Sequence, residues 1–193
     1  MTATRGDREM LAGMPRERLL DLFFLQVRNI WRVDGLYFLG IEKRFGTQAS
    51  TEIDRECWNT MATLESRALS KVLGLSADTI DSFMTLLRNS SWALDVAQKE
   101  VETSSDKGVF RVVECRTQKT RIAKGLGEFP CKPVRQGYLE SFAMESNPNI
   151  QVRCVTCPPD EHPLGTWCEW EFTVRREEGA SKIGGSRLRR GDK

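Results

Sequence analysis

The residues best suited to chemistry are the cysteines of the C-terminal half. Cys154 and Cys157 are separated by two residues, a spacing that lets two sulfurs on one turn bind the same metal ion. Four thiolates would suffice for tetrahedral zinc or for an iron–sulfur cluster. The candidates for such a metal site are Cys115, Cys131, Cys154 and Cys157. Fifteen residues separate the first two, so a second close pair is missing. The alternative is that Cys115, Cys154 and Cys168 are small core side chains on strand faces.

The only histidine, His162, lies in a proline-rich loop after Cys157. Its ring could be a metal ligand or a general base that Asp160 or Glu161 orients, with Cys157 as the nucleophile. Cys157, His162 and Asp160 are the candidate catalytic set. The simpler interpretation is a solvated loop histidine, because nothing in the spacing directs His162 toward a thiol.

An acidic residue on an apolar helix face is the third candidate. Asp34 lies between Trp31 and Phe38 in one apolar stripe, and a buried carboxylate is costly unless it is paired. We therefore expect its carboxylate near a pocket or an arginine, although Asp34 before Gly35 could instead cap a broken helix. Arginines that could pair with it are Arg121, Arg135 and Arg153. The candidate ligand-binding residues are Trp31, Asp34, Trp58, Arg121, Arg135 and Trp167. Asp54 and Glu65 flank Trp58 in a similar way.

Helices should position the N-terminal candidates. Apolar residues recur every three or four positions from Leu20 to Phe45, which predicts a helix that ends at Gly46 and that could break at Asp34-Gly35. A second helix is predicted over residues 48–73, and a third runs from Ser76 to about residue 101.

Strands dominate the second half. Alternating apolar residues predict strands at 109–115, 150–155 and 167–174, with a helix from Pro133 to residue 146 and irregular chain at 117–130. The alternation places Trp170 in the core and Trp167 outside it. It also predicts that Cys154 and Cys168 face inward.

These elements predict an α+β fold. An N-terminal helical half of about three helices packs on a small C-terminal antiparallel or mixed sheet with one intervening helix. We expect a disordered N-terminus at 1–14 and a single domain at 15–176, with a helical half (15–103) and a sheet half (107–176). A flexible basic tail should follow at 177–193.

The composition narrows the class of protein. The net charge of the 193 residues is +2, which gives no overall field for a nucleic acid or a membrane surface. The sequence has no apolar run of signal-peptide or membrane-span length, so we expect a cytoplasmic protein whose cysteines are thiols or ligands. The basic tail comes without any finger or helix-turn-helix signature, so nucleic-acid binding is not expected. A homo-oligomer stays open.

Several short segments also carry a resemblance to known proteins. They are Trp31–Leu39, Phe45-Gly46, Trp58, Cys115, Cys131, Asn147–Asn149 and Cys168–Phe172. Over about residues 15 to 174 the chain resembles a group of uncharacterised prokaryotic cytosolic proteins. It also looks like their presumed relatives, the L-2-amino-thiazoline-4-carboxylic acid hydrolases, which open a sulfur-containing ring to give a carbamoyl-cysteine.

The resemblance implies a small-molecule-binding protein that hydrolyses a cyclic amide-like or thiazoline-like bond, and it assigns no catalytic residue. Two alternatives stand beside it. One is a cysteine-ligated zinc or iron–sulfur protein with a sensing, redox or structural role, and the other is a non-catalytic interaction domain.

Overall fold

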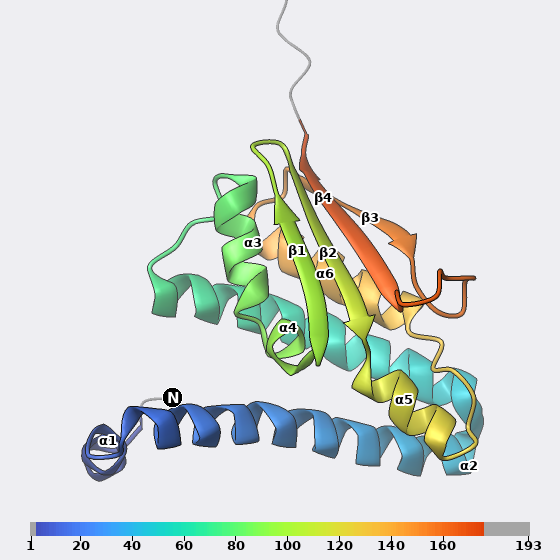
Figure 1. The fold of residues 1–193 in the computed structure, drawn as a ribbon, viewed down its shortest axis with the longest axis horizontal. Coiled ribbons are helices and arrows are strands. Elements are labelled where there is room, and N and C mark those ends of the chain that lie inside the picture. Colours follow the sequence, from blue (N-terminus) through green and yellow to red (C-terminus); the bar gives the residue numbers. More distant parts are fainter. Residues whose placement is uncertain (1–2, 176–193) are drawn as a thin grey trace, which may run out of the picture.

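A helical hairpin and an antiparallel sheet make up the α+β fold of the computed structural model, which describes residues 3–175 (Figure 1). The helices are α1 (Arg5–Ala12), α2 (Arg16–Leu73), α3 (Ile80–Arg88), α4 (Ser91–Asp95), α5 (Arg116–Ala123) and α6 (Lys132–Ser146). The strands are β1 (Gln98–Thr103), β2 (Lys107–Glu114), β3 (Ile150–Thr156) and β4 (Cys168–Val174). The predicted fold class is confirmed, and the sheet is antiparallel throughout.

Helix α2 is a hairpin of two arms that meet at Gly46. Gly46 has φ 87° and ψ 166°, a positive-φ conformation that favours glycine, and the chain reverses there (Figure 1). The first arm covers residues 16–45 and the second arm covers residues 47–73. The predicted break at Asp34-Gly35 is not present, because helical backbone continues through both residues and the Asp34 carboxylate bonds to a distant tryptophan instead of capping.

Three segments differ from the sequence prediction. Residues Arg5–Ala12 form a helix where disorder was expected, and the Thr4 side chain accepts a hydrogen bond from the Asp7 N–H as its N-cap. Gln98–Thr103 is strand β1 rather than the end of a helix, because it pairs with β2 along its length. Arg116–Ala123 is helix α5 rather than irregular chain.

The sheet has the strand order β1-β2-β4-β3 and buries one face. Phe110 pairs with Trp170 across β2 and β4, and both side chains are fully buried. Trp167 is only half-buried, as the alternation predicted. Cys168 is buried and Cys154 packs partly buried against the core, which confirms their predicted direction.

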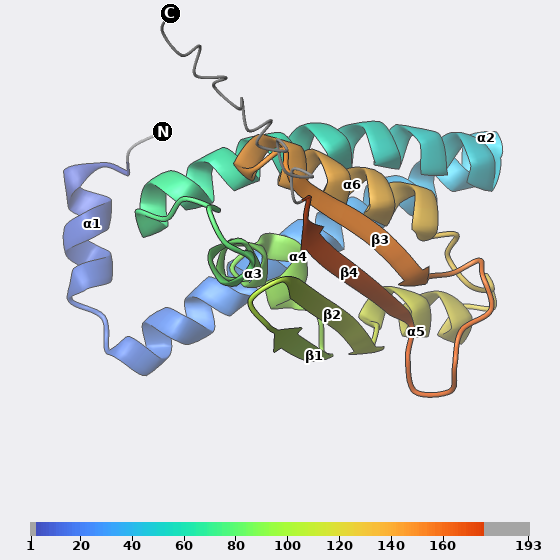
Figure 2. The same cartoon turned by 90° about the horizontal axis from the view of Figure 1, so that it is seen from above.

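Helix α6 lies between this sheet and the second arm of α2, and supplies much of the core (Figure 2). Its residues Tyr138, Leu139 and Phe142 are fully buried. The helices approach closely at Gly137, where an added Cβ would lie 2.3 Å from the Asn59 Oδ1 atom. This contact fixes the second arm against the sheet layer.

In the described chain, residues 3–175, no helix combines the length and the apolar character needed to cross a membrane. The basic tail predicted at 177–193 lies outside the described residues.

Candidate functional site

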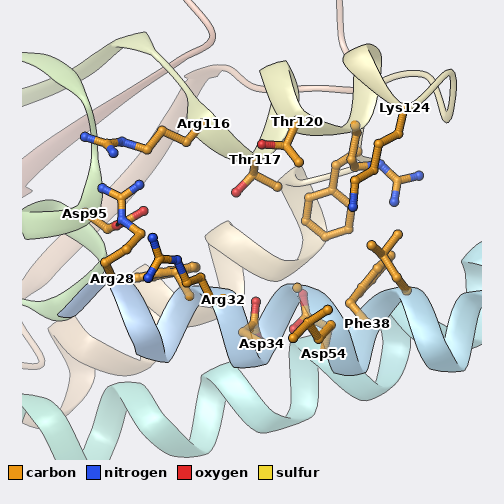
Figure 3. Close-up of a pocket in the computed structure, with 16 residues that line it drawn as sticks. Arg28, Arg32, Asp34, Phe38, Asp54, Asp95, Arg116, Thr117, Thr120 and Lys124 are labelled. Carbon is orange, nitrogen blue, oxygen red and sulfur yellow. Dashed lines mark ion pairs between the residues drawn. The ribbon is translucent and has the colours of Figure 1, made fainter. Parts of the chain in front are cut away.

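A pocket of about 370 Å³ opens between the first arm of α2 and helix α5 (Figure 3). A smaller inner cavity of about 60 Å³ adjoins it and extends toward α6 and the sheet. The two share several lining residues, which are Trp31, Asp34, Asp54, Asp95, Arg116, Thr117 and Phe129. Apolar atoms form most of the pocket surface, although ten of its sixteen lining residues are polar or charged.

Two carboxyl groups meet at the base of the pocket. Asp34 comes from the first arm of α2 and Asp54 from the second, so the turn at Gly46 brings them together (Figure 3). The Trp58 indole N–H donates to the Asp34 Oδ1 atom at 3.0 Å, and the two carboxyl groups are hydrogen-bonded to each other. We call these two residues the carboxyl pair.

Burial changes the proton affinity of the carboxyl pair. Desolvation and, after it, the neighbouring Asp34 charge together raise the pKa of Asp54 from 3.8 to about 8. Desolvation also raises the pKa of Asp34, but hydrogen bonds from Trp58 and Asp54 oppose that effect. Asp54, whose pKa is about 8, therefore keeps its proton at neutral pH, and its O–H can donate to the Asp34 carboxylate.

Stacked aromatic rings enclose a buried arginine above the carboxyl pair. The Trp31 and Trp58 rings lie 4.5 Å apart and nearly parallel. The Arg135 guanidinium lies 4.5 Å from the centre of the Trp92 ring and 5.0 Å from that of Tyr138, and Arg135 is only 4 % exposed. Its Nε and Nη1 atoms have no hydrogen-bond partner within residues 3–175. These donors line the inner cavity and are available to a bound molecule.

A thiol completes the inner cavity. Cys131 precedes helix α6 and is half-buried, next to Arg135 and Cys157. A hydrogen bond from Cys157 and the charge of Arg135 lower the pKa of Cys131 to about 7, although burial opposes them. The same hydrogen bond raises the pKa of Cys157, because that thiol is the donor.

Basic side chains surround the mouth of the pocket. Arg32, Arg116 and Lys124 line it, and all three are exposed (Figure 3). The Arg28 Nε atom lies 2.8 Å from the Asp95 carboxylate. The excess of cations gives this entrance a positive potential, which favours an anionic or electron-rich ligand.

A buried ion pair holds the far wall of the pocket. Arg121 donates two hydrogen bonds of 2.9 Å to the Glu42 carboxylate. Its guanidinium also lies over the rings of Phe38 and Phe129. Since both charges are satisfied by one another, Arg121 is a wall residue that joins α5 to the first arm of α2.

The structure brings five of the six predicted ligand-binding residues together at the pocket or the inner cavity. They are Trp31, Asp34, Trp58, Arg121 and Arg135. The predicted position of Asp34, near a pocket and away from bulk solvent, is confirmed, and Arg135 is the arginine whose charge acts on it. Trp167 lies elsewhere, with its ring 4.9 Å from that of His162.

The predicted catalytic set is not assembled. Asp160 pairs with Lys132 at 2.6 Å, and the His162 Nε2 atom lies 3.5 Å from the Glu128 carboxylate. Cys157 is fully buried beside other thiols. None of the predicted three lines the pocket or the inner cavity.

The predicted metal ligands lie near one another without forming a metal group. Among residues 3–175, no three or more His, Cys, Asp or Glu side chains are placed to hold a metal ion. All six cysteines are free. The Cys157 thiol is hydrogen-bonded to Cys131 and to Cys168, which is not one of the predicted ligands, while Cys154 packs partly buried against the core.

The sequence did not lead us to place Asp54 and Cys131 in this site, although it contains a signal for Asp54. Asp54 was noted only as a neighbour of Trp58, and Cys131 only as a metal ligand. A tryptophan and an aspartate lie one helical turn apart on each side of Gly46, as Trp31 with Asp34 and as Asp54 with Trp58. A hairpin at that glycine would predict that the two pairs meet.

Comparison with known families places this site in an uncharacterised group. The model of a family of unknown function, DUF6125, matches residues 12–174. This range includes both arms of α2, the sheet and every residue of the carboxyl pair and the inner cavity. No curated protein matches the chain.

Proposed function

Since the match covers most of the chain, the protein belongs to the DUF6125 family, and we propose that it is a small-molecule hydrolase that acts on a cyclic amide-like or thiazoline-like bond. The observation that carries the proposal is the carboxyl pair. Two carboxyl groups lie together at the base of a pocket of small-molecule size, and the pKa of one of them, Asp54, is raised to about 8.

The carboxyl pair supplies both proton transfers that hydrolysis needs. The ionised Asp34 removes a proton from water as the water oxygen attacks the ring carbon. The protonated Asp54 gives its proton to the ring atom that leaves. The bond between water oxygen and carbon forms and the ring bond breaks. The net charge of the pair stays the same, because Asp34 gains one proton and Asp54 loses one, and transfer of that proton from Asp34 to Asp54 restores the starting state. A pKa of about 8 keeps Asp54 protonated at neutral pH.

Arg135 suits the charge that develops in this reaction. Its unpartnered Nε and Nη1 donors line the inner cavity, where water is scarce. Donors that are fixed before the reaction stabilise a developing oxyanion without reorganisation. Trp31, Trp92 and Tyr138 hold the guanidinium in place. The basic pocket mouth would draw an anionic substrate toward these groups.

The resemblance to the L-2-amino-thiazoline-4-carboxylic acid hydrolases supports the same chemistry. Opening a thiazoline ring requires water attack on an sp² carbon and protonation of the departing atom, which the carboxyl pair can perform. The segment Trp31–Leu39 that carries much of the resemblance contains Asp34 and one wall of the pocket.

A substrate panel tests the proposal. The protein is incubated with a set of cyclic amides and thiazolines, and mass spectrometry detects products that have gained one water. Asp34→Asn is compared with Glu56→Gln, an exposed position on the second arm that leaves the pocket intact. We expect turnover by the wild type and by Glu56→Gln, and its loss in Asp34→Asn. Equal turnover in all three, or none by any, would contradict the proposal.

An interaction role through the first arm of α2 is the second candidate. Ten large apolar side chains between residues 16 and 45 are at least 37 % exposed. Five of them recur at spacings of four, seven, three and four residues, which makes one stripe along the helix; they are Leu19, Phe23, Ile30, Val33 and Tyr37. The ten together expose on the order of 1000 Å², close to the ~800 Å² per partner of a stable interface.

We take a second copy of this chain as the partner, because this spacing allows two identical helices to pack along the stripe. Light scattering after gel filtration should show a dimer for the wild type and a monomer for Phe23→Glu. Val72→Glu, at an 81 % exposed position on the second arm, should stay dimeric. A monomeric wild type would rule this interface out.

A further inference from the structure

We propose that Cys131 and Cys157 form a redox-sensitive pair, in which a hydroperoxide oxidises Cys131 and Cys157 then closes a reversible disulfide. The inference does not depend on the proposed hydrolysis. It rests on how the fold gathers thiols at one end of the sheet.

The sheet topology collects the cysteines. In an antiparallel sheet the ends of β2 and β3 lie beside the start of β4 between them. Cys115 follows β2, Cys157 follows β3 and Cys168 begins β4, so all three lie at the same end of the sheet. The Cys157 thiol is hydrogen-bonded to the sulfurs of Cys131 and Cys168.

A main-chain hydrogen bond brings the segments that carry Cys131 and Cys157 side by side. The residues that follow the two cysteines are bonded to each other, because the Lys132 N–H donates to the Pro158 carbonyl at 2.7 Å. The Lys132 Nζ atom also lies 2.6 Å from the Asp160 carboxylate, which adds a second link. Chains joined in this way lie about 5 Å apart, and a disulfide needs Cα atoms about 5.5 Å apart.

The two thiols have different surroundings, and these assign their roles. Cys131 is half-buried and lines the inner cavity, so a small peroxide can reach it through the pocket. It lies at the N-terminus of α6, and the Arg135 side chain follows one turn later with two unpartnered donors. Both features favour the thiolate, the form that attacks peroxide. Cys157 is fully buried, so it meets the oxidised Cys131 but not the peroxide.

Oxidation takes place in two steps, first at Cys131 and then between Cys131 and Cys157. The Cys131 thiolate attacks one peroxide oxygen, the O–O bond breaks, and the leaving alkoxide or hydroxide takes up a proton, which gives a sulfenic acid and an alcohol or water. The Cys157 sulfur then attacks the Cys131 sulfur and water leaves, which forms the disulfide. A dithiol reductant restores both thiols.

The experiment treats the reduced full chain with hydrogen peroxide and maps the peptides without reduction. We expect the wild type to lose two of its six free thiols and to yield a Cys131–Cys157 linked peptide that dithiothreitol releases. In Cys157→Ser a sulfenic acid should accumulate on Cys131 and react with dimedone. Cys57→Ser, which removes the exposed cysteine, should behave like the wild type.

Three results would overturn the proposal. One is oxidation of Cys57 while Cys131 stays reduced. Another is a Cys157–Cys168 linkage in the wild type. The third is protein isolated with one equivalent of zinc that Cys131→Ser and Cys157→Ser both lose, because the thiols would then be metal ligands. The wild-type peptide map decides the first two even if a variant fails to fold.

Discussion

The carboxyl pair should make the stability of the protein depend on pH in a defined direction. An unfolded aspartate ionises near 3.9, whereas Asp54 in the folded protein has a pKa of about 8. Between these values the folded state keeps a proton that the unfolded state has lost. Raising the pH through this window therefore lowers the free energy of unfolding. Asp54→Asn removes the titrating group, so the variant should gain stability relative to the wild type as the pH rises.

The size of the effect follows from the shift. At ~1.4 kcal/mol for each pH unit, the whole shift of Asp54 to about 8 corresponds to ~6 kcal/mol. Water in the open pocket screens part of this cost, so we expect Asp54→Asn to exceed the wild type by ~1–3 kcal/mol above about pH 8. Below about pH 4 the difference in the free energy of unfolding should vanish, because Asp54 is then protonated in both the folded and the unfolded wild type and is as neutral as the asparagine of the variant.

Urea unfolding at about pH 5, 7 and 9 measures this difference. Glu56→Gln on the same arm is the matched control, since it removes one exposed carboxylate and leaves the pocket unchanged. Its difference from the wild type should stay within ~0.5 kcal/mol at each pH. The reasoning is refuted if the Asp54→Asn difference is constant with pH, or if it shrinks as the pH rises.

Two further substitutions test the framework of the site. Glu42→Gln leaves the Arg121 guanidinium, whose side chain is 8 % exposed, without its charge partner, and should lower the free energy of urea unfolding by ~2–4 kcal/mol; a loss below ~0.5 kcal/mol would show that the pair is hydrated. Gly137→Ala places a Cβ atom 2.3 Å from the Asn59 side chain and should cost ~1–3 kcal/mol, whereas Gly35→Ala, with nothing within 4 Å, should gain up to ~1 kcal/mol in the same assay. Equal effects of the two alanines would contradict the close approach of α6 and α2.

The sequence predicted five residues of the pocket and the inner cavity, because their residue types were unusual for their positions. Asp34 interrupts an apolar stripe, and the cost of burying an unpaired carboxylate was enough to predict a pocket or a partner. Trp31 and Trp58 were predicted as ligand-binding residues because each lies on a helix face that also carries an aspartate. Strand alternation likewise separated Trp170, which is fully buried, from Trp167.

What the sequence could not supply was tertiary pairing. Asp34 and Asp54 meet only because α2 reverses at Gly46, and periodicity within one helix does not give the angle between two. Strand β1 carries one apolar residue, Val101, among five polar ones, so only its pairing with β2 makes it a strand. The catalytic role predicted for His162 rested on its being the only histidine, and its nearest partners prove to be Glu128 and Trp167.

Ring opening of L-2-amino-thiazoline-4-carboxylic acid tests the central claim most directly, because the reaction exposes a thiol that a colorimetric reagent detects. Initial rates are compared at neutral pH for the wild type, Asp54→Asn and Glu56→Gln. The carboxyl pair predicts equal rates for the wild type and Glu56→Gln, and a rate at least ~100-fold lower for Asp54→Asn. An Asp54→Asn rate equal to that of the wild type would contradict the claim.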